Sequence, residues 1–141
     1  MNILEVQDLC KTYGTGETEV HALNHVSFSV RKGEFIAIIG ESGSGKSTLL
    51  NVVGALDGAT SGRVWIDGQD IFSMPEKKLT VFRRQHIGFI FQSFNLISFK
   101  DAVENVALPL FYQGVSRKKR NALALEYLDR LGLKEWAHHM P

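Results

Sequence analysis

Alternating apolar and polar residues near the N-terminus predict two β-strands. Residues 3–9 and residues 22–30 carry hydrophobic side chains at about every second position, imperfectly in the first segment, as is typical of half-buried strands. A polar loop that contains Gly14 and Gly16 separates them. After a turn, residues 35–39 form an unbroken apolar run rich in β-branched residues. Such a run predicts a strand covered on both faces, as in the middle of a parallel sheet.

The pattern then changes to a helical period and back to short strands. Apolar residues from Leu49 to Leu56 fall at helical spacing, which predicts a helix that begins at about Lys46 and ends before residue 57. Two short strands are expected at residues 63–66 and near residue 71, joined by an Asp-Gly turn. A helix and a small hairpin therefore follow the first strands.

Two capping patterns predict further helices. Ser73 and Glu76 have the spacing of a capping box and open a short helix that ends at about residue 84. Asp101 and Glu104 repeat the pattern before a second apolar helix. Each pair predicts the residue at which its helix begins.

The remaining elements are one strand and one helix. Residues 87–91 are a compact apolar strand candidate that ends at Gln92. A last helix is expected from Ser116, with Ala124, Leu128 and Leu131 on its apolar face and Gly132 as its left-handed C-terminal cap. The C-terminal part is therefore expected to be helical.

Composition and charge narrow the function classes. The chain has 141 residues with 44% hydrophobic and 22% charged residues, which fits one globular domain and excludes a disordered chain. Its net charge of +1 makes nucleic acid an unexpected partner. No apolar run approaches the roughly 20 residues that span a bilayer, and no signal peptide is recognisable. With a single cysteine, Cys10, these features predict a protein inside the cell without direct membrane insertion.

A glycine-rich loop carries the chemistry. It has the pattern G-x-x-x-x-G-K-[ST] and lies between an apolar strand candidate and a predicted helix, the context that a phosphate-binding loop requires. Glycines let the backbone amides turn inward, and the N-terminus of the following helix adds to the same anion site. The candidate ligand-binding residues are Gly40, Glu41, Ser42, Gly43, Ser44, Gly45, Lys46, Ser47 and Thr48.

Three side chains of this loop have specific expected roles. The Lys46 ammonium can reach the β- and γ-phosphates, and the Ser47 hydroxyl is placed to coordinate Mg²⁺. Thr48 can add a hydrogen bond near the α-phosphate. Kinases, GTPases and ATPases share this loop, so a P-loop nucleotide or small-molecule kinase and a non-catalytic nucleotide-binding module both remain alternatives.

The residues around the loop narrow the class of phosphate-loop protein. Two strand-like segments and an aromatic residue, Tyr13, precede it, which favours an added β-subdomain over a nucleotide kinase. From Leu9 to Pro141 the chain resembles the N-terminal part of ABC transporter ATP-binding proteins, in particular the bacterial branch of the macrolide-export and lipoprotein-release types. The matching stretches are ALNHVSF, GEF, GESGSGKSTLLN, TSG, IGFIFQSFNL and ENVALPL.

This resemblance implies a fold, ligands and partners. The fold is α/β, a P-loop core with an N-terminal antiparallel β portion at about residues 1–92 and the start of a helical part at about residues 93–141. Tyr13 matches the aromatic that stacks on adenine, and Gln92 matches the catalytic glutamine that touches Mg²⁺ and the attacking water. The implied function is ATP binding and hydrolysis that drives transport. The implied partners are a transmembrane permease subunit and a second ATP-binding domain, at the inner face of the bacterial membrane.

Several parts of the family pattern are not found before Pro141. The family's signature loop, magnesium-binding aspartate, catalytic glutamate and switch histidine lie beyond the matched region. We therefore expect this chain to bind nucleotide without appreciable ATPase activity of its own. We also expect an uncovered apolar face beside residues 35–39, and self-association through it.

Overall fold

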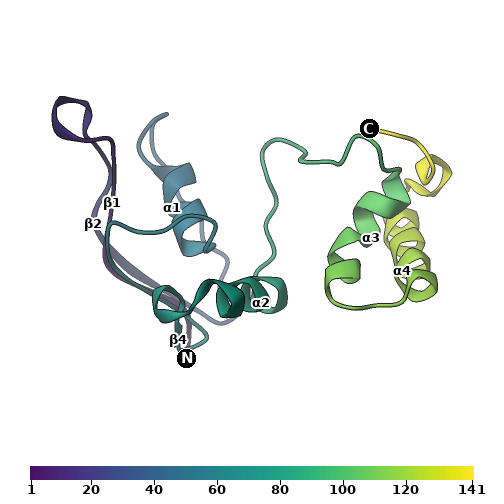
Figure 1. Cartoon of the computed structure of the whole chain (residues 1–141), viewed down its shortest axis with the longest axis horizontal. Coiled ribbons are helices and arrows are strands. Elements are labelled where there is room, and N and C mark those ends of the chain that lie inside the picture. The colour runs from purple at the N-terminus through teal and green to yellow at the C-terminus, as the bar shows by residue number, and fades with distance from the viewer. The chain divides into compact units, whose positions relative to one another are not determined.

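The computed structural model describes every residue, Met1–Pro141, and divides into two compact units, Met1–Ile87 and Gly88–Pro141. The first contains the sheet and two α-helices, and the second is helical (Figure 1). None of the helices combines the length and hydrophobicity that crossing a bilayer requires. The boundary expected near residue 92 between the phosphate-loop part and the helical part stays a prediction.

The first unit holds one antiparallel sheet in the order β2-β1-β3-β4. Its elements, in chain order, are β1 (Asn2–Tyr13), η1 (Gly16–Thr18), β2 (Val20–Arg31), α1 (Lys46–Val53), β3 (Ser61–Ile66), β4 (Gln69–Asp70), η2 (Ile71–Ser73) and α2 (Glu76–His86). The strands predicted around residues 3–9, 22–30 and 63–66 are confirmed, although the first two are longer. The antiparallel character of the N-terminal β portion is confirmed as well.

Two local features explain the shape of the strands. Asp67 and Gly68 have φ of 50° and 72°, so the predicted Asp-Gly turn joins β3 to β4. Asp8 and His25 both have φ of 52° in the region where the register between β1 and β2 shifts. His25 Nδ1 lies 2.6 Å from Asp8 Oδ1. These bulges let the long hairpin bend.

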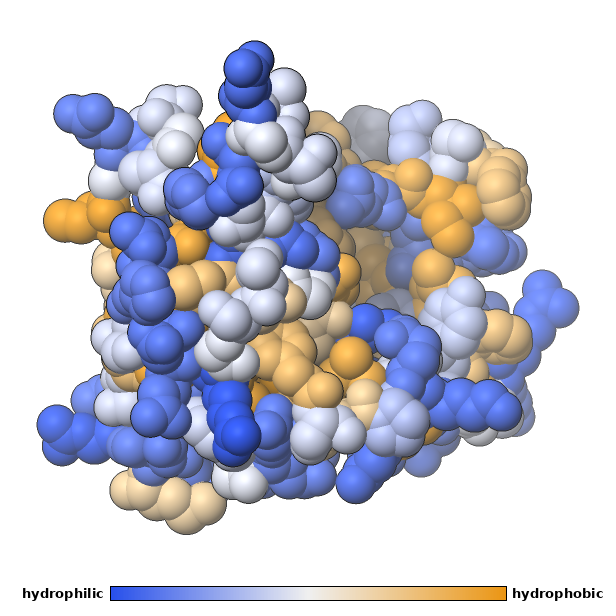
Figure 2. Space-filling view, turned by 60° about the vertical axis from the view of Figure 1, so that its left-hand side comes forward, coloured by the Kyte–Doolittle hydropathy of each residue, from blue (hydrophilic) through white to orange (hydrophobic).

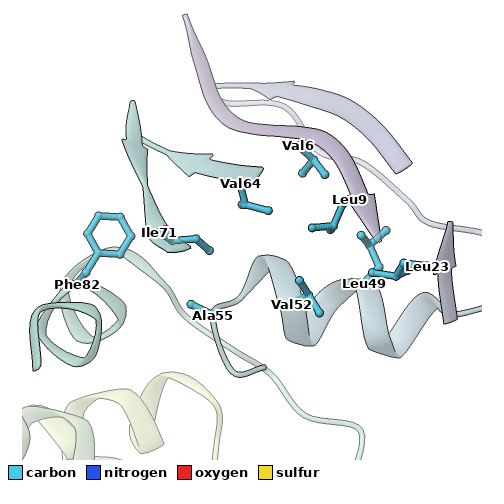
Figure 3. Packing of buried hydrophobic residues seen from close by; sticks show 9 residues of the cluster. All are labelled: Val6, Leu9, Leu23, Leu49, Val52, Ala55, Val64, Ile71 and Phe82. Carbon is cyan, nitrogen blue, oxygen red and sulfur yellow. The ribbon is translucent and has the colours of Figure 1, made fainter. Parts of the chain in front are cut away.

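The core of the first unit lies between the sheet and α1. Side chains of β1 and β3 point toward α1, where Leu49 and Val52 lie at helical spacing (Figure 3). Leu9, Val52 and Val64 are fully buried. This packing fixes α1, and therefore the loop that precedes it, against the sheet.

The second unit is a pair of helices with a short C-terminal turn. It contains α3 (Ala102–Tyr112), α4 (Arg117–Arg130) and η3 (Lys134–Trp136). The predicted capping box of α3 is confirmed: Glu104 N–H donates to Asp101 Oδ1 at 2.8 Å, and Asp101 N–H donates to Glu104 Oε2 at 3.1 Å. Gly132, with φ of 70°, follows the last helical turn of α4 as predicted.

Asn105 ties residues 97–101 to α3. Its Oδ1 accepts a hydrogen bond from Ile97 N–H at 2.8 Å. Its Nδ2 lies within 3.1 Å of the carbonyl oxygens of Ile97, Lys100 and Asp101. One side chain thus forms hydrogen bonds with several backbone groups of the segment that leads into α3.

Two strand predictions are wrong in this structure. Residues 35–39 and residues 87–91 form no strand. Phe35 is 98% exposed and Ile90 is 99% exposed, so these runs are not buried. A parallel strand forms only against neighbouring strands, and neither segment pairs with one. The expected exposure of apolar side chains is confirmed, and hydrophobic surface is visible among hydrophilic side chains in Figure 2.

The capping box expected at Ser73 and Glu76 is also wrong. Pro75 is the N-cap of α2 and makes no side-chain capping hydrogen bond. Glu76 is the first helical residue, and Ser73 Oγ donates instead to Asp70 O at 2.8 Å. Pro75 has an extended conformation before the helix, and α2 therefore begins after it without a capping hydrogen bond from Ser73.

Candidate functional site

The glycine-rich loop leads directly into α1, as the sequence predicts. Gly45 is the N-cap residue of α1 and has φ of 92°, and Gly43 has φ of 79°. Both values lie in the left-handed region that favours glycine. Leu49 N–H donates to Gly45 O at 2.8 Å and closes the first helical turn. The glycines therefore allow the sharp entry into the helix.

Two of the glycines also leave no space for a side chain. A Cβ atom on Gly45 would lie 2.3 Å from Ala22 O in β2, and one on Gly40 would lie 2.7 Å from Ser44 Oγ. The loop thus approaches the backbone of β2 closely at one point and folds tightly on itself at another. These contacts fix the loop's path relative to the sheet.

Lys46 bends back into this loop. Its Nζ donates to Gly40 O at 2.8 Å, to Glu41 O at 2.5 Å and to Ser44 Oγ at 3.2 Å. The Lys46 ammonium group therefore forms hydrogen bonds with three residues of the loop. An ammonium group and backbone amides together form a site for an anion with several oxygen atoms.

The first turn of α1 contributes further donors. Backbone N–H groups at the start of a helix have no partner within the helix, and the helix dipole adds partial positive charge there. Ser47 is exposed and Thr48 is half-buried in this turn. A hollow of about 380 Å³ adjoins the loop, lined on its other side by His21, Ala22, Leu23 and Asn24. The hollow provides space beside the loop, and the loop and Lys46 provide the polar groups.

The residues present fit a magnesium ion that is held mainly by phosphate oxygens. Ser47 offers a hydroxyl oxygen in the first turn of α1, and Mg²⁺ commonly keeps several waters while taking few protein ligands. No three His, Cys, Asp or Glu side chains gather anywhere in the structure. A magnesium ion bound together with a nucleotide needs no such cluster.

Tyr13 lies at the end of β1 and is 43% exposed. Its hydroxyl donates to Asp57 Oδ2 at 3.0 Å, and Lys11 Nζ lies 5.0 Å from the centre of its ring. Lys11 Nζ also contacts Asp57 Oδ1 at 3.0 Å. The hydrogen bond from Lys11, followed by that from Tyr13, holds the pKa of Asp57 below its usual value, although desolvation opposes the shift.

Sequence reasoning missed Lys11 and Asp57. A usable signal existed for the first, because residues two apart on a strand share one face, and Lys11 is two residues before Tyr13. Asp57 precedes Gly58 just after α1, a position typical of a turn in which aspartate bonds the nearby backbone. Nothing in the sequence indicated that this turn meets β1.

Gln92 is in the second unit, whereas the loop residues and Tyr13 are in the first. It is exposed and lies in a segment without regular secondary structure. The described contacts therefore bring together the loop and α1, and separately Tyr13 and Asp57. The predicted role of Gln92 stays a prediction.

Comparison with known proteins gives the family. The family model described as ABC transporter matches residues 23–141. The chain is 50% identical over 133 residues to the macrolide export ATP-binding/permease protein MacB of Mannheimia succiniciproducens, covering 94% of this chain and 21% of that protein. It is 47% identical over 139 residues to an uncharacterized ABC transporter ATP-binding protein of Thermotoga maritima, covering 99% of this chain and 59% of the relative.

A solved structure supports the same assignment. The dimeric post-hydrolysis state of the ATP-binding cassette MJ0796, bound to ADP and Pi, is 42% identical and has a TM-score of 0.91. The match covers 98% of this chain and 61% of that one. The chain thus belongs to the ABC transporter family, and its predicted α/β cassette fold is confirmed. It spans about a fifth to three-fifths of the length of the relatives named here.

Proposed function

We propose that this chain is the nucleotide-binding part of an ABC-type ATPase and binds ATP with Mg²⁺ through residues 40–48. The observation that carries the proposal is the glycine loop that Lys46 closes at the N-terminus of α1. Such a loop combines inward backbone amides, a helix N-terminus and one ammonium group. This combination suits the phosphate chain of a nucleotide.

Each part of the loop has a distinct proposed role. The amides of Gly43 to Thr48 surround the β-phosphate, and Gly45 keeps the helix N-terminus open to it. Lys46 exchanges its contacts with the Gly40 and Glu41 carbonyls for phosphate oxygens. Ser47 would hold Mg²⁺, which, when bound, neutralises charge on the phosphates.

Two residues outside the loop also have proposed roles, each argued from its own chemistry. Tyr13 is 43% exposed, which leaves room for stacking on the nucleotide base, and Asp57 and Lys11 contact its hydroxyl and its ring. Gln92 has an amide that can ligate a metal through oxygen and donate from nitrogen. We assign Tyr13 to base binding and Gln92 to contact with Mg²⁺ and the attacking water.

We further propose that the complete protein couples ATP binding and hydrolysis to transport across a bacterial membrane. Names of similar proteins support this: one combines an ATP-binding part with a permease, and one cassette is dimeric. The proposed partners are therefore a transmembrane permease and a second ATP-binding domain. In that assembly the chain would lie at the inner face of the membrane.

The 141-residue chain itself should hydrolyse ATP very slowly. Phosphoryl transfer needs a positioned nucleophile and charge stabilisation together, and the acidic residues after Gln92 serve helix caps and helix surfaces. A phosphate-release assay with and without Mg²⁺ tests this. Multiple turnovers that disappear in Lys46→Ala would contradict it.

Titration calorimetry with magnesium-ATP tests the binding proposal. We expect saturable heat for the unaltered chain and its loss in Lys46→Ala, with circular dichroism confirming that the variant folds. Absence of heat with the folded unaltered chain would refute the assignment. ADP release that depends on an added acceptor would instead identify a kinase.

A further inference from the structure

We propose that Lys11 and Asp57 are positioning residues that hold the Tyr13 ring in the orientation in which it stacks on the nucleotide base. The inference rests on the proposed nucleotide-binding function. It adds a second set of residues to the site, outside the phosphate loop. We call these three residues the tyrosine clamp.

Every polar group of the clamp has a partner. Asp57 Oδ2 accepts from the Tyr13 hydroxyl at 3.0 Å, and Asp57 Oδ1 accepts from Lys11 Nζ at 3.0 Å. Gly58 N–H also donates to Asp57 Oδ1 at 2.8 Å, and Lys11 Nζ donates to Gly58 O at 2.6 Å. Because both carboxylate oxygens are engaged, the hydroxyl end of Tyr13 has a defined direction.

The same contacts leave one face of the ring for a ligand. Lys11 Nζ lies 5.0 Å from the ring centre, within the range of a cation–π contact, and its side chain is only 14% exposed. Tyr13 as a whole is 43% exposed. With a cation over one face and the hydroxyl fixed, the remaining face is the one on which a planar base can stack.

Helix α1 links this clamp to the phosphate loop. Lys46 begins α1, and the turn after the helix places Asp57, whose N–H donates to Asn51 O at 3.2 Å. Eight helical residues span about 12 Å. One short rigid element therefore carries the phosphate-binding groups at its N-terminus and the tyrosine's acceptor just beyond its C-terminus.

A purely structural role for the clamp and a role in positioning the ring predict different ligand affinities in variants that break the clamp. If the clamp only joined β1 to the turn after α1, breaking it would lower stability and would weaken all ligands of the loop alike. If it positions the ring, breaking it weakens only ligands that contain a base. Magnesium tripolyphosphate has the phosphate chain without a base, so it separates the two roles.

The test measures the dissociation constants of magnesium-ATP and magnesium tripolyphosphate by calorimetry in the full chain. The variants are Tyr13→Phe, Asp57→Asn and Lys11→Met, each of which keeps the size of its side chain. Asp129→Asn is the matched control, because Asp129 forms an exposed ion pair with Lys134 in the second unit. Melting curves confirm that each variant is folded at the assay temperature.

We expect each clamp variant to weaken magnesium-ATP binding about three- to tenfold, because the ring remains but its orientation for stacking is no longer fixed. Tripolyphosphate should bind within about twofold of the unaltered chain. The Tyr13→Phe and Asp57→Asn effects should add only in part, because both alter the hydrogen bond between Tyr13 and Asp57, and Asp57→Asn also weakens the contact with Lys11.

Two results would overturn the inference: unchanged ATP affinity in the folded clamp variants, or equal weakening of both ligands. Failure of the unaltered chain to bind either ligand would refute the proposed function instead.

Discussion

Alanine in place of Gly45 tests whether the loop depends on its close approach to β2. The substitution adds one methyl group at a residue with φ of 92°, where the new Cβ would lie 2.3 Å from Ala22 O. Gly43 and Gly58 provide matched comparisons. Gly43 has φ of 79° with nothing within 4 Å of its Cβ position, and Gly58 has neither a left-handed φ nor a close neighbour.

The expected loss of unfolding free energy follows from these two differences. A left-handed conformation costs an alanine about 1–2 kcal/mol, which is the whole expected effect at Gly43. At Gly45 the methyl group must also move about 1 Å to reach an ordinary carbon–oxygen contact. Overpacking of this kind costs about 1–3 kcal/mol, so Gly45→Ala should lose about 2–5 kcal/mol in total. Gly58→Ala should gain about 0.4–1 kcal/mol from the less flexible unfolded chain.

Urea unfolding followed by tryptophan fluorescence measures these differences in the first unit alone. The chain has two tryptophans, and Trp65 lies in β3 of the first unit. A Trp136→Phe background therefore makes Trp65 the only reporter. The same proteins are titrated with magnesium-ATP, and Gly45→Ala should lose measurable binding because the loop and the start of α1 must shift away from β2.

Equal stability of Gly45→Ala and Gly58→Ala would refute this reasoning. It would mean that the loop does not lie against β2 in solution. A loss at Gly43 as large as that at Gly45 would show that backbone conformation, and not the approach to Ala22 O, is decisive.

Three further predictions concern the rest of the chain. Lys46→Ala should weaken magnesium-ATP at least about tenfold in calorimetry, whereas Lys77→Ala on α2 should leave the affinity unchanged. Hydrogen bonds from Glu104 N–H and, next in size, from His138 lower the pKa of Asp101. The Asp101 carboxylate therefore stabilises the second unit fully above pH 3.8, the usual pKa of aspartate, and this stabilisation is lost as the pH falls through the lowered pKa of the folded state. Asp101→Asn should keep the helix cap and reduce this acid dependence in urea unfolding, and an unchanged dependence would count against the assignment. The exposed apolar run should cause self-association at micromolar concentration, and lysine at both Phe35 and Ile39, which are 98% and 90% exposed, should reduce it in light scattering.

Local signals were sufficient to predict the elements that form from neighbouring residues. The Asp67-Gly68 turn, the capping box at Asp101 and the left-handed Gly132 are each determined within a few residues, and the structure confirms all three. The glycine loop and its entry into α1 are equally local. The family was indicated by the resemblance of longer stretches of sequence, such as GESGSGKSTLLN and ENVALPL, and the family match confirms it.

Features that depend on distant residues were not predictable in the same way. Residues 35–39 have the composition of a buried parallel strand, but composition does not supply the neighbouring strands that would pair with it. The contact of Tyr13 with Asp57 joins residues 44 positions apart, and no periodic pattern reports such a meeting. Pro75 set the start of α2 although the serine and glutamate had the expected spacing.

The hydrogen bonds of Asn105 have a consequence for proteolysis. A protease needs several residues of extended, mobile backbone, which residues 97–101 cannot offer while the Asn105 side chain holds the carbonyl groups of Ile97, Lys100 and Asp101. Limited digestion with chymotrypsin should therefore cut after Phe91 or Phe94 and spare Phe99, although the Phe99 side chain is 77% exposed. The fragment that remains would begin within a few residues of Ile97 and keep α3 and α4 together.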